Sequence, residues 1–408
     1  ADGFKELLES EHWDIVPGGK YYVTRNNTSI LAFKVGTKLD NYSFNIVTSH
    51  TDSPTFKVKE NAEIEVKNKY TQLNTEGYGG MLCATWLDRP LSIAGRVLVS
   101  EGNSIVTKLL NIDRDLLMIP NVAIHMNRAA NDGFKYNLQV DMLPLLSAGD
   151  DRQKDFKQII ADELGVKKED ILGHDLYLYN RMAPSIWGAN EEFISAGHLD
   201  DLQCGFASLK ALLAGYNDES IDIMACFDNE EVGSGTKQGA DSTLLRDTLI
   251  RINNALGKTE EDYHRALASS FMLSADNAHA VHPNHPEHTD ATNCTYMNEG
   301  VVVKSHAGQK YTSDGVSMAV VKALASGADV PLQYFANRSD KAGGSTLGNI
   351  AMAQASMNAV DIGLPQLAMH SSYETAGIKD TYYAISLMKA LFDSHIQETS
   401  THSLEIKR

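Results

Sequence analysis

Two adjacent glutamates at the end of an apolar run are the first residues in this chain that could do chemistry. The strand-like run 221–227 is followed by Asp228, Asn229, Glu230 and Glu231, and then by a Gly-Ser-Gly turn. Neighbouring carboxylates at the mouth of a strand repel each other and lose hydration, a cost that makes sense if one binds a cation and the other moves a proton. The alternative for an isolated pair is a solvated acidic turn, so the rest of the chain must decide.

Four more groups of metal-ligand residue types stand elsewhere along the chain. His50 and Asp52 follow a strand-like run that ends at residue 49, and Asp276 follows another that ends at residue 274. Asp200 lies where a loop opens into a helix, and His370 ends an apolar stretch near the C-terminus. In an open α/β sheet, ligands bind beyond the carboxyl ends of the strands. We therefore expect these side chains to face a common site.

Some of these residues also have plainer roles. Asp52 is two residues from His50 and could orient its imidazole without touching a metal. Asp is a favoured helix N-cap, and we expect that role for Asp201. Asp200, just ahead of the helix, could instead share its two oxygens between two cations. Four histidines follow Asp276 closely (His279, His282, His285 and His288). Prolines interrupt this segment, so it is not expected to be helical. We expect some of these histidines to be surface residues.

The ligand types indicate the metal. Two histidines and three carboxylates gathered around Asp200 would supply five ligands, a sensible set for two divalent ions. Nitrogen with carboxylate oxygen favours Zn²⁺, and Mn²⁺ or Co²⁺ fit the same geometry. The sequence contains no His-Glu-x-x-His and no Gly-x-Ser-x-Gly, and Ile252 stands where a phosphate-binding loop ending in 257–259 would need its first glycine.

Composition limits the class of protein. The 408 residues are enough for two domains or for one large domain with an insertion. A net charge of −17 argues against nucleic acid as a partner and suits an oligomer that must stay in solution. The four cysteines show no paired spacing, which is typical of reduced thiols in a cytoplasmic protein (Cys83, Cys204, Cys226 and Cys294). We find neither a run of 18 apolar residues nor a basic-then-apolar leader, so no membrane partner is expected.

Strand and helix patterns alternate from residue 191 onwards. Helical patterns cover 201–215, 314–326 and 380–394, and strand patterns cover 221–227, 269–274 and 331–336. This alternation predicts an α/β fold with a mostly parallel sheet and helices on both faces. The pattern at residues 4–8 indicates a helix at the start of the chain, and the stretch 380–394 indicates a helix at its end. The abrupt start at Ala1 suggests that natural residues precede Ala1.

The middle of the chain has a different pattern. Alternating strand-like segments at 63–67 and 96–99, with a polar helix-forming stretch at 150–170, predict a β-rich insert at 58–187. The catalytic domain is then expected in two parts, 1–57 and 188–408.

With these residues in view, the chain resembles the aspartyl aminopeptidases, a family of co-catalytic di-zinc exopeptidases. The segments that carry the resemblance occur in the family's order, at 50–54, 199–200, 228–234, 274–276, 279–284 and 366–371. The resemblance implies one metal on His50 and Asp276, a second on Glu231 and His370, and Asp200 as the bridge between them. It also implies Glu230 as general base and Asp52 as the residue that steers His50.

The resemblance further implies an assembly and a specificity. The insert would mediate dimers, dimers would build a dodecamer, and His125 would enter the active site of a neighbouring subunit. Lys304 matches the position associated with an acidic substrate side chain, so the expected reaction is release of N-terminal Asp or Glu from peptides. His198 and Asp201 depart from the residues most frequent beside the bridging aspartate, so broader or neutral specificity remains open.

Two other classes compete with this interpretation. A di-metal carboxypeptidase or deacylase could share the core, although the segment 279–284 and the position of the insert argue against it. A non-catalytic shell or cargo protein could keep the fold, but it would not need to keep Glu230 beside five ligands.

Overall fold

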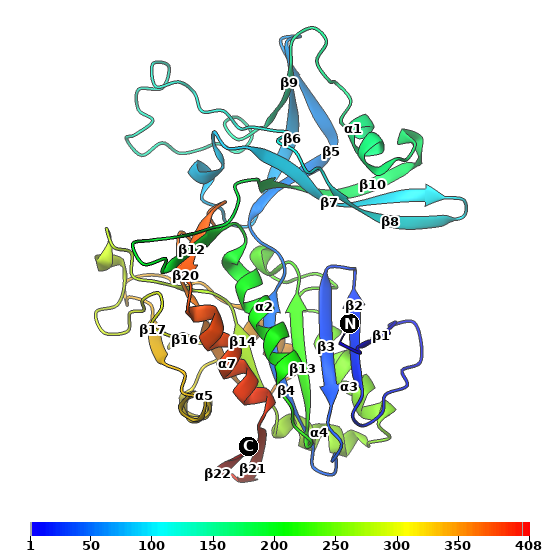
Figure 1. The fold of residues 1–408 in the computed structure, drawn as a ribbon, viewed down its shortest axis with the longest axis vertical. Coiled ribbons are helices and arrows are strands. Elements are labelled where there is room, and N and C mark those ends of the chain that lie inside the picture. Colours follow the sequence, from blue (N-terminus) through cyan, green and yellow to red (C-terminus); the bar gives the residue numbers. More distant parts are fainter. Residues whose placement is uncertain (1, 402) are drawn as a thin grey trace. The chain divides into compact units, whose positions relative to one another are not determined.

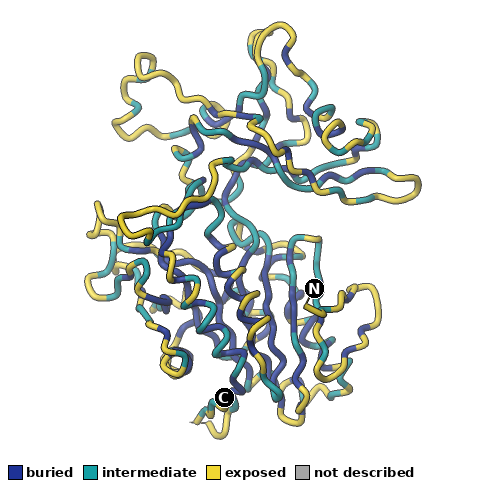
Figure 2. The backbone as a smooth tube through the Cα atoms, in the orientation of Figure 1, coloured by how far each residue is buried: buried dark blue, intermediate teal, exposed yellow. Residues whose placement is uncertain are grey.

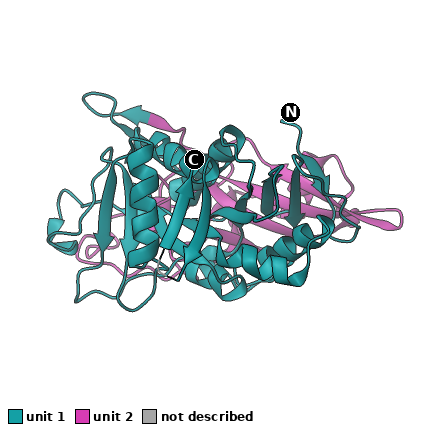
Figure 3. Cartoon of the chain, turned by 90° about the horizontal axis from the view of Figure 1, so that it is seen from below, with its two compact units in different colours: residues 1–52, 186–369, 375–408 teal, residues 53–185, 370–374 magenta. Residues whose placement is uncertain are grey.

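The chain forms two compact units in the computed structural model, which describes residues 2–401 and 403–408 (Figure 3). Unit 1 contains Ala1–Asp52, Ile186–Met369 and Thr375–Arg408, and unit 2 contains Ser53–Ser185 and His370–Glu374. The division therefore falls at 52/53 and 185/186, where the sequence analysis placed it at 57/58 and 187/188. The first difference arises because the strand that begins unit 2 already starts at Thr55.

Unit 1 is built on a large sheet with a parallel centre. Among the described residues nine strands run side by side, in the order β1 (Lys5–Leu7), β2 (Lys20–Arg25), β3 (Ser29–Val35), β13 (Ser220–Phe227), β4 (Ser43–His50), β14 (Phe271–Ala275), β18 (Asn358–Gly363), β16 (Val301–Ser305) and β17 (Leu332–Ala336) (Figure 1). The four central strands β13, β4, β14 and β18 are mutually parallel. Every residue of β4 and β13 is buried, as expected for parallel strands covered on both faces (Figure 2).

Helices cover both faces of this sheet. The neighbouring residues Ile46 and Val47 of β4 belong to different apolar clusters, because successive side chains of a strand point to opposite faces. The Ile46 cluster includes residues of α3 (Leu244–Ala255), α4 (Glu260–Ala268) and α6 (Leu347–Gln354). The Val47 cluster includes residues of α2 (Leu199–Ala214), α5 (Gly315–Gly327) and α7 (Asp380–Phe392). The predicted α/β fold with a mostly parallel sheet and helices on both faces is confirmed.

Smaller elements complete unit 1. A short sheet has the order β11 (Ser185–Trp187), β12 (Phe193–Ala196), β20 (Glu374–Gly377), β19 (Pro365–Leu367) and β15 (Ala278–His279). Two single-turn 3₁₀ helices, η3 (Glu230–Val232) and η4 (Pro286–His288), follow β13 and β15. No helix in the described part of the chain is both long and apolar enough to cross a membrane.

The prediction was wrong at both ends of the chain. Residues 4–8 do not form a helix: β1 pairs with β2, and Leu7 is the buried residue of that strand. The helix α7 does not close the chain, because the hairpin β21 (His395–Ser400) and β22 (Ser403–Lys407) follows it. In both places the segment is too short for its own sequence pattern to determine its structure. The strand with which it pairs determines it instead.

Unit 2 is a β-rich body with its own core. Its described residues form a six-stranded sheet with antiparallel neighbours, in the order β8 (Ser104–Asn111), β7 (Leu91–Glu101), β10 (Ile171–Asn180), β5 (Thr55–Val66), β6 (Tyr70–Tyr78) and β9 (Leu145–Ala148). The helix α1 (Phe156–Leu164) and the 3₁₀ helices η1 (Cys83–Trp86) and η2 (Lys168–Asp170) complete it. The rings of Phe56 and Trp86 pack edge to face inside this core, with their centroids 5.4 Å apart.

Candidate metal centre

The parallel register brings the predicted ligands of unit 1 to one edge of the sheet. His50 is the last residue of β4 and pairs with Phe227, the last residue of β13. The segment carrying Glu230 continues from β13, and Asp276 directly follows β14 on the other side of β4. Chain direction alone therefore places these groups beside one another.

The side chains close into two overlapping clusters. Ligand atoms of His50, Asp200 and Asp276 all lie within 4.8 Å of one another, and so do those of His50, Glu230 and Glu231. The Nε2 atom of His50 is 3.5 Å from Oδ1 of Asp200. One imidazole and four carboxylates thus share a small volume of unit 1.

The tautomer of His50 follows from its neighbours. Its Nδ1 atom lies 3.0 Å from the carbonyl oxygen of Asp52. A carbonyl oxygen only accepts hydrogen bonds, so Nδ1 carries the proton and donates. The lone pair of Nε2 then faces the cluster, as a metal ligand requires.

Asp52 has a wider role than the sequence indicated. Its Oδ1 atom accepts the backbone N–H of Glu230 at 3.1 Å, and its Oδ2 atom accepts that of Glu231 at 3.2 Å. Oδ1 also lies 3.5 Å from Nδ1 of His50. One buried carboxylate therefore fixes both the imidazole and the 3₁₀ turn that carries the two glutamates.

The start of α2 supplies two further carboxylates. Asp200 and Asp201 are both buried and have non-helical backbone angles, so the regular helix begins after them. The Oδ2 atom of Asp201 accepts the backbone N–H of His50 at 3.2 Å. From its sequence, Asp201 was expected to cap the helix and to lie beside the bridging aspartate, but its bond to the backbone of His50 was not expected. Two consecutive aspartates ahead of a helix were the available signal, but a capping pattern looks the same.

Asn277 is a second residue that the sequence analysis missed. Its side-chain amide donates to the carbonyl of Leu199 at 3.0 Å and to the side-chain oxygens of Gln203 and Gln366 at 3.2 and 3.0 Å. The residue after Asp276 thereby ties the end of β14 to the turn that presents Asp200. Its place in the sequence, directly after a predicted ligand, was the signal.

Burial raises the proton affinity of this cluster. Burial raises the pKa of Glu230 to about 7, and Asp276 adds to the shift. Burial also raises the pKa of Asp276 to about 6, although Lys304 opposes it. Burial lowers the pKa of His50, but hydrogen bonds with Asp200 and Asp52 raise it more, to well above its usual value. The fold has thus collected more negative charge than its own cations balance, and divalent ions would offset it.

Lys304 is buried beside this cluster. Its Nζ atom donates to the carbonyl of Asn277 at 2.9 Å and lies 3.8 Å from Oδ2 of Asp276. The ammonium is also 5.6 Å from the centre of the Tyr311 ring. Lys304 is 3% exposed, so a substrate side chain could reach it only by competing with these contacts.

The remaining two predicted residues lie in unit 2. The Nδ1 atom of His370 is 2.7 Å from the carbonyl oxygen of Gly80, so this imidazole also carries its proton on Nδ1. The backbone N–H of His370 donates to Glu374 at 2.7 Å. His125 is exposed, between the exposed apolar residues Ile124 and Met126. Their roles toward the metals and the substrate stay predictions.

The donors suit zinc. Imidazole nitrogen and carboxylate oxygen are the ligand types of catalytic zinc sites, and a second group orients each ligand, as Asp52 does for His50. Four carboxylates beside one imidazole carry enough charge for two divalent ions.

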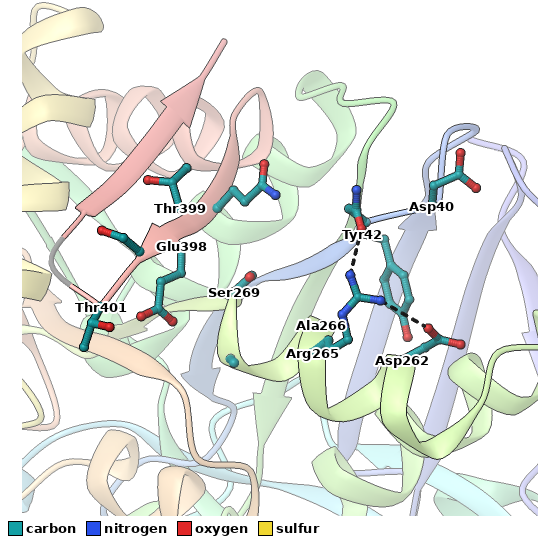
Figure 4. Close-up of a pocket in the computed structure, with 13 residues that line it drawn as sticks. Asp40, Tyr42, Asp262, Arg265, Ala266, Ser269, Glu398, Thr399 and Thr401 are labelled. Atoms are coloured by element: carbon teal, nitrogen blue, oxygen red, sulfur yellow. Dashed lines mark hydrogen bonds and ion pairs between the residues drawn. The ribbon is translucent and has the colours of Figure 1, made fainter.

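A separate pocket lies elsewhere in unit 1. It has a volume of about 340 Å³ and is lined by residues 40–42, 262, 265–266, 268–269 and 397–401 (Figure 4). Inside it, Arg265 contacts Asn41 at 3.0 Å and Asp262 at 3.7 Å. Tyr42 precedes the first residue of β4 and His50 is its last, so the pocket is at the other end of that strand and contains none of the predicted ligands.

Known proteins are similar to this chain in sequence and fold. The family model described as aminopeptidase I zinc metalloprotease (M18) matches residues 1–392. The chain belongs to this M18 family. Among curated M18 relatives, a probable M18 family aminopeptidase 2 of Clostridium novyi (strain NT) is 47% identical over 398 residues, which cover 96% of this chain and 92% of that protein. The predicted resemblance and the predicted class, a zinc metallo-aminopeptidase, are confirmed.

Solved M18 structures agree with the fold. A chain of the Ape4 and Nbr1 complex, determined by cryo-electron microscopy, is 35% identical with a TM-score of 0.92, and the match covers 96% of this chain and 80% of that one. The mApe1 dodecamer of S. cerevesiae is 28% identical with a TM-score of 0.83, over 96% of this chain and 90% of that one.

Proposed function

We propose that this M18 aminopeptidase removes N-terminal residues from peptides, with two divalent ions in the cluster around Asp200 and with Glu230 as general base. The observation that carries the proposal is the position of Glu230. Its backbone is held by Asp52, its carboxylate is in the His50 cluster, and burial raises its pKa to about 7. A carboxylate whose pKa is raised by burial is well matched to taking up a proton and giving it back.

The ligands divide by role. His50 and Asp276 would hold one ion, Glu231 and His370 the other, and Asp200 both. The Nδ1 protons of both histidines are donated to backbone carbonyls, which supports their use of Nε2 as the ligand atom. When bound, the ions supply Lewis acidity, which lowers the pKa of a water and polarises the scissile carbonyl. Zinc is the first choice, and Mn²⁺ or Co²⁺ suit the same donors.

Glu230 performs the proton transfers in this proposal. Its carboxylate takes a proton from the water that attacks the scissile carbonyl, and then delivers that proton to the departing amine. Asp52 keeps Glu230 in place through the backbone, so the side chain remains free to accept and release the proton.

We extend the proposal to acidic N-terminal residues. Lys304 is the cation that supports it, since its ammonium lies next to Asp276. An incoming carboxylate would have to displace Asn277 or Asp276 from Lys304. The broader alternative, an aminopeptidase for neutral residues, follows if that exchange does not occur. A panel of aspartyl, glutamyl, alanyl and leucyl substrates separates the two, and loss of aspartyl preference in Lys304→Met would tie it to this residue.

We also propose a homo-oligomer of dimers assembled as a dodecamer, with unit 2 in the dimer contacts and His125 serving a neighbouring site. One support is a stripe of exposed apolar side chains at helical spacing along α2, with the exposed Tyr216 just beyond its end (Leu202, Phe206, Leu209 and Leu213). A second is the exposed apolar segment around His125, and a third is the dodecamer formed by the mApe1 relative. The free state of all four cysteines supports a cytoplasmic location.

The base assignment has a direct test. Glu230→Gln preserves shape and should keep the metal content while turnover falls by roughly 10²–10⁴-fold, the usual contribution of general acid–base catalysis. Metal analysis and turnover would be measured on the same preparation. Turnover close to that of the unchanged enzyme would end the assignment. Loss of metal in the variant would indicate that Glu230 is a metal ligand. Wild-type protein that binds both metals but has no activity would favour the non-catalytic alternative.

The shared site is tested by mixing subunits. His125→Ala and Glu230→Gln proteins should each have low turnover, with metal retained. A mixed assembly contains sites in which an intact Glu230 meets an intact His125 from a neighbour, so part of the activity should return. Native mass spectrometry would verify both subunits in one particle. Verified mixed particles without any recovery would show that His125 serves its own subunit or none.

A further inference from the structure

The histidine-rich segment after β15 contains a cluster that the catalytic centre does not use. In η4 and the residue before it, His285, Glu287 and His288 are all exposed, and ligand atoms from the three lie within 4.8 Å of one another. None of the three belongs to the clusters around His50. The cluster therefore needs its own explanation.

The distances within the cluster are close to those around a bound zinc ion. Nδ1 of His285 lies 3.1 Å from Oε1 of Glu287, and Nε2 of His288 lies 3.9 Å from the same oxygen. Ligands held about 2.0–2.1 Å from a tetrahedral zinc are separated from each other by roughly 3.3 Å. A small rotation of the His288 side chain would bring all three donors into that range.

The backbone around the cluster is fixed. The N–H of His285 donates to the carbonyl of His282 at 3.0 Å, and the N–H of His288 donates to the carbonyl of His285 at 3.2 Å. The Glu287 carbonyl accepts from the guanidinium of Arg338, which is itself paired with Asp340. The loop after β17 thus supports the turn from outside, so binding would order three side chains and not a whole segment.

The imidazole rings are also aligned. The rings of His285 and His288 are stacked, with centroids 5.4 Å apart and planes 26° from parallel, and the centroid of the His282 ring is also 5.4 Å from that of His285. Nδ1 of His282 accepts the N–H of Asn284 at 3.2 Å, so its other nitrogen is the one that carries the proton. This leaves His282 as a stacking neighbour. Nδ1 of His285 faces the carboxylate of Glu287 and would give up its proton when an ion binds, so that His285 and His288 supply the nitrogen ligands.

We propose that His285, Glu287 and His288 form an accessory surface site for a borderline divalent cation such as Zn²⁺, Co²⁺ or Cu²⁺. Two imidazoles and one carboxylate are the donor set of many three-ligand zinc sites, with the fourth position left to water. Because the site is exposed and has no cage around it, it releases its ion to a chelator before the buried centre does. Occupied, it joins the two ends of η4 through one ion.

The test compares metal content at controlled free zinc. Tag-free protein, His285→Ala/His288→Ala, and Glu287→Gln would be dialysed against a series of zinc buffers and their bound zinc measured. Both variants should bind one zinc fewer per subunit than the wild type at high free zinc, with peptidase turnover unchanged. All altered residues are exposed, so equal thermal unfolding in chelator would show that the variants are folded.

A matched control is available on α4. His264 is exposed and lies 3.9 Å from Glu260, which gives two donors where the proposed site has three. His264→Ala should therefore bind as much zinc as the wild type. Equal zinc in the wild type and both site variants at every free concentration would overturn the proposal, and so would an equal loss in His264→Ala. The measured quantity is the difference of one zinc ion per subunit between the wild type and the variants. This difference does not depend on whether the buried centre holds two ions.

Discussion

Asp52→Asn separates the positioning of the metal ligands from the chemistry that follows. The wild-type carboxylate accepts the N–H groups of Glu230 and Glu231, one on each oxygen. An asparagine keeps one acceptor and puts an amide group where the other was, facing a backbone N–H that can no longer donate to it. Asp52 lies outside the proposed ligand set, so the damage reaches the metals only through His50 and the two glutamates.

The size of the effect can be worked from these bonds. A hydrogen bond to a charged group contributes about 1.5–3 kcal/mol, and a neutral one about 0.5–1.5 kcal/mol. One bond is lost and the other is weakened by about 1 kcal/mol, which together gives about 3 kcal/mol. At 1.4 kcal/mol per factor of ten, this is up to about 100-fold in metal affinity. Loss of an outer partner of a metal ligand typically costs about 10–100-fold.

The assay is activity as a function of free zinc in metal buffers. The midpoint should shift to higher zinc by one to two orders of magnitude, while kcat at saturating zinc falls less, because Asp52 touches no reacting atom in the proposed mechanism. Asp262→Asn is the control, since this carboxylate forms the capping box of α4 and accepts from Thr259 at 2.9 and 2.7 Å. An unchanged zinc midpoint in Asp52→Asn, with a loss of thermal stability like that of the control, would refute the reasoning.

Three other changes test separate parts of the molecule. Asp200→Asn should weaken both metals, and elemental analysis showing one ion lost with the other at full occupancy would exclude it as the bridge. Lys304→Met removes the buried partner of Asp276. It should lower the free energy of unfolding by up to about 3–5 kcal/mol, measured by denaturant unfolding of the chelator-treated protein. Burial lowers the pKa of His395, so the folded protein binds its proton less readily than the unfolded chain. Stability from this residue is present above the ordinary imidazole pKa of about 6.5 and falls as the pH drops below it, and His395→Gln should flatten that acid loss in thermal melts.

The site in unit 1 was predictable because it follows from strand direction. A parallel sheet puts the carboxyl ends of its strands on one edge, so residues at or just after the ends of β4, β13 and β14 must be neighbours once those strands are adjacent. The sequence shows where each strand ends, and the adjacency of β13, β4 and β14 then brings His50, Glu230 and Asp276 together.

Contacts that depend on side-chain direction were not predictable. The pattern around Asp201 is that of a helix cap, and nothing local indicates that its carboxylate reaches the backbone of His50. Lys304 was read as a substrate contact from its position in a motif, but burial and its bond to Asn277 are tertiary facts. The ends of the chain failed for a related reason, since β1 and the hairpin β21–β22 are defined by their partners.

The pair Glu230 and Glu231 shows how local geometry makes two roles from one motif. In a strand, consecutive side chains point to opposite faces, so adjacent glutamates could not both face one site. The strand ends before them: Asn229 and Gly233 have φ values of 62° and 94° and bracket a 3₁₀ turn. That turn lets both carboxylates enter the His50 cluster. Asp52 accepts hydrogen bonds from the two backbone N–H groups, so it does not restrain the two glutamate side chains. One carboxylate can then stay on a metal while its neighbour moves a proton, which is the division of labour that the proposed mechanism needs.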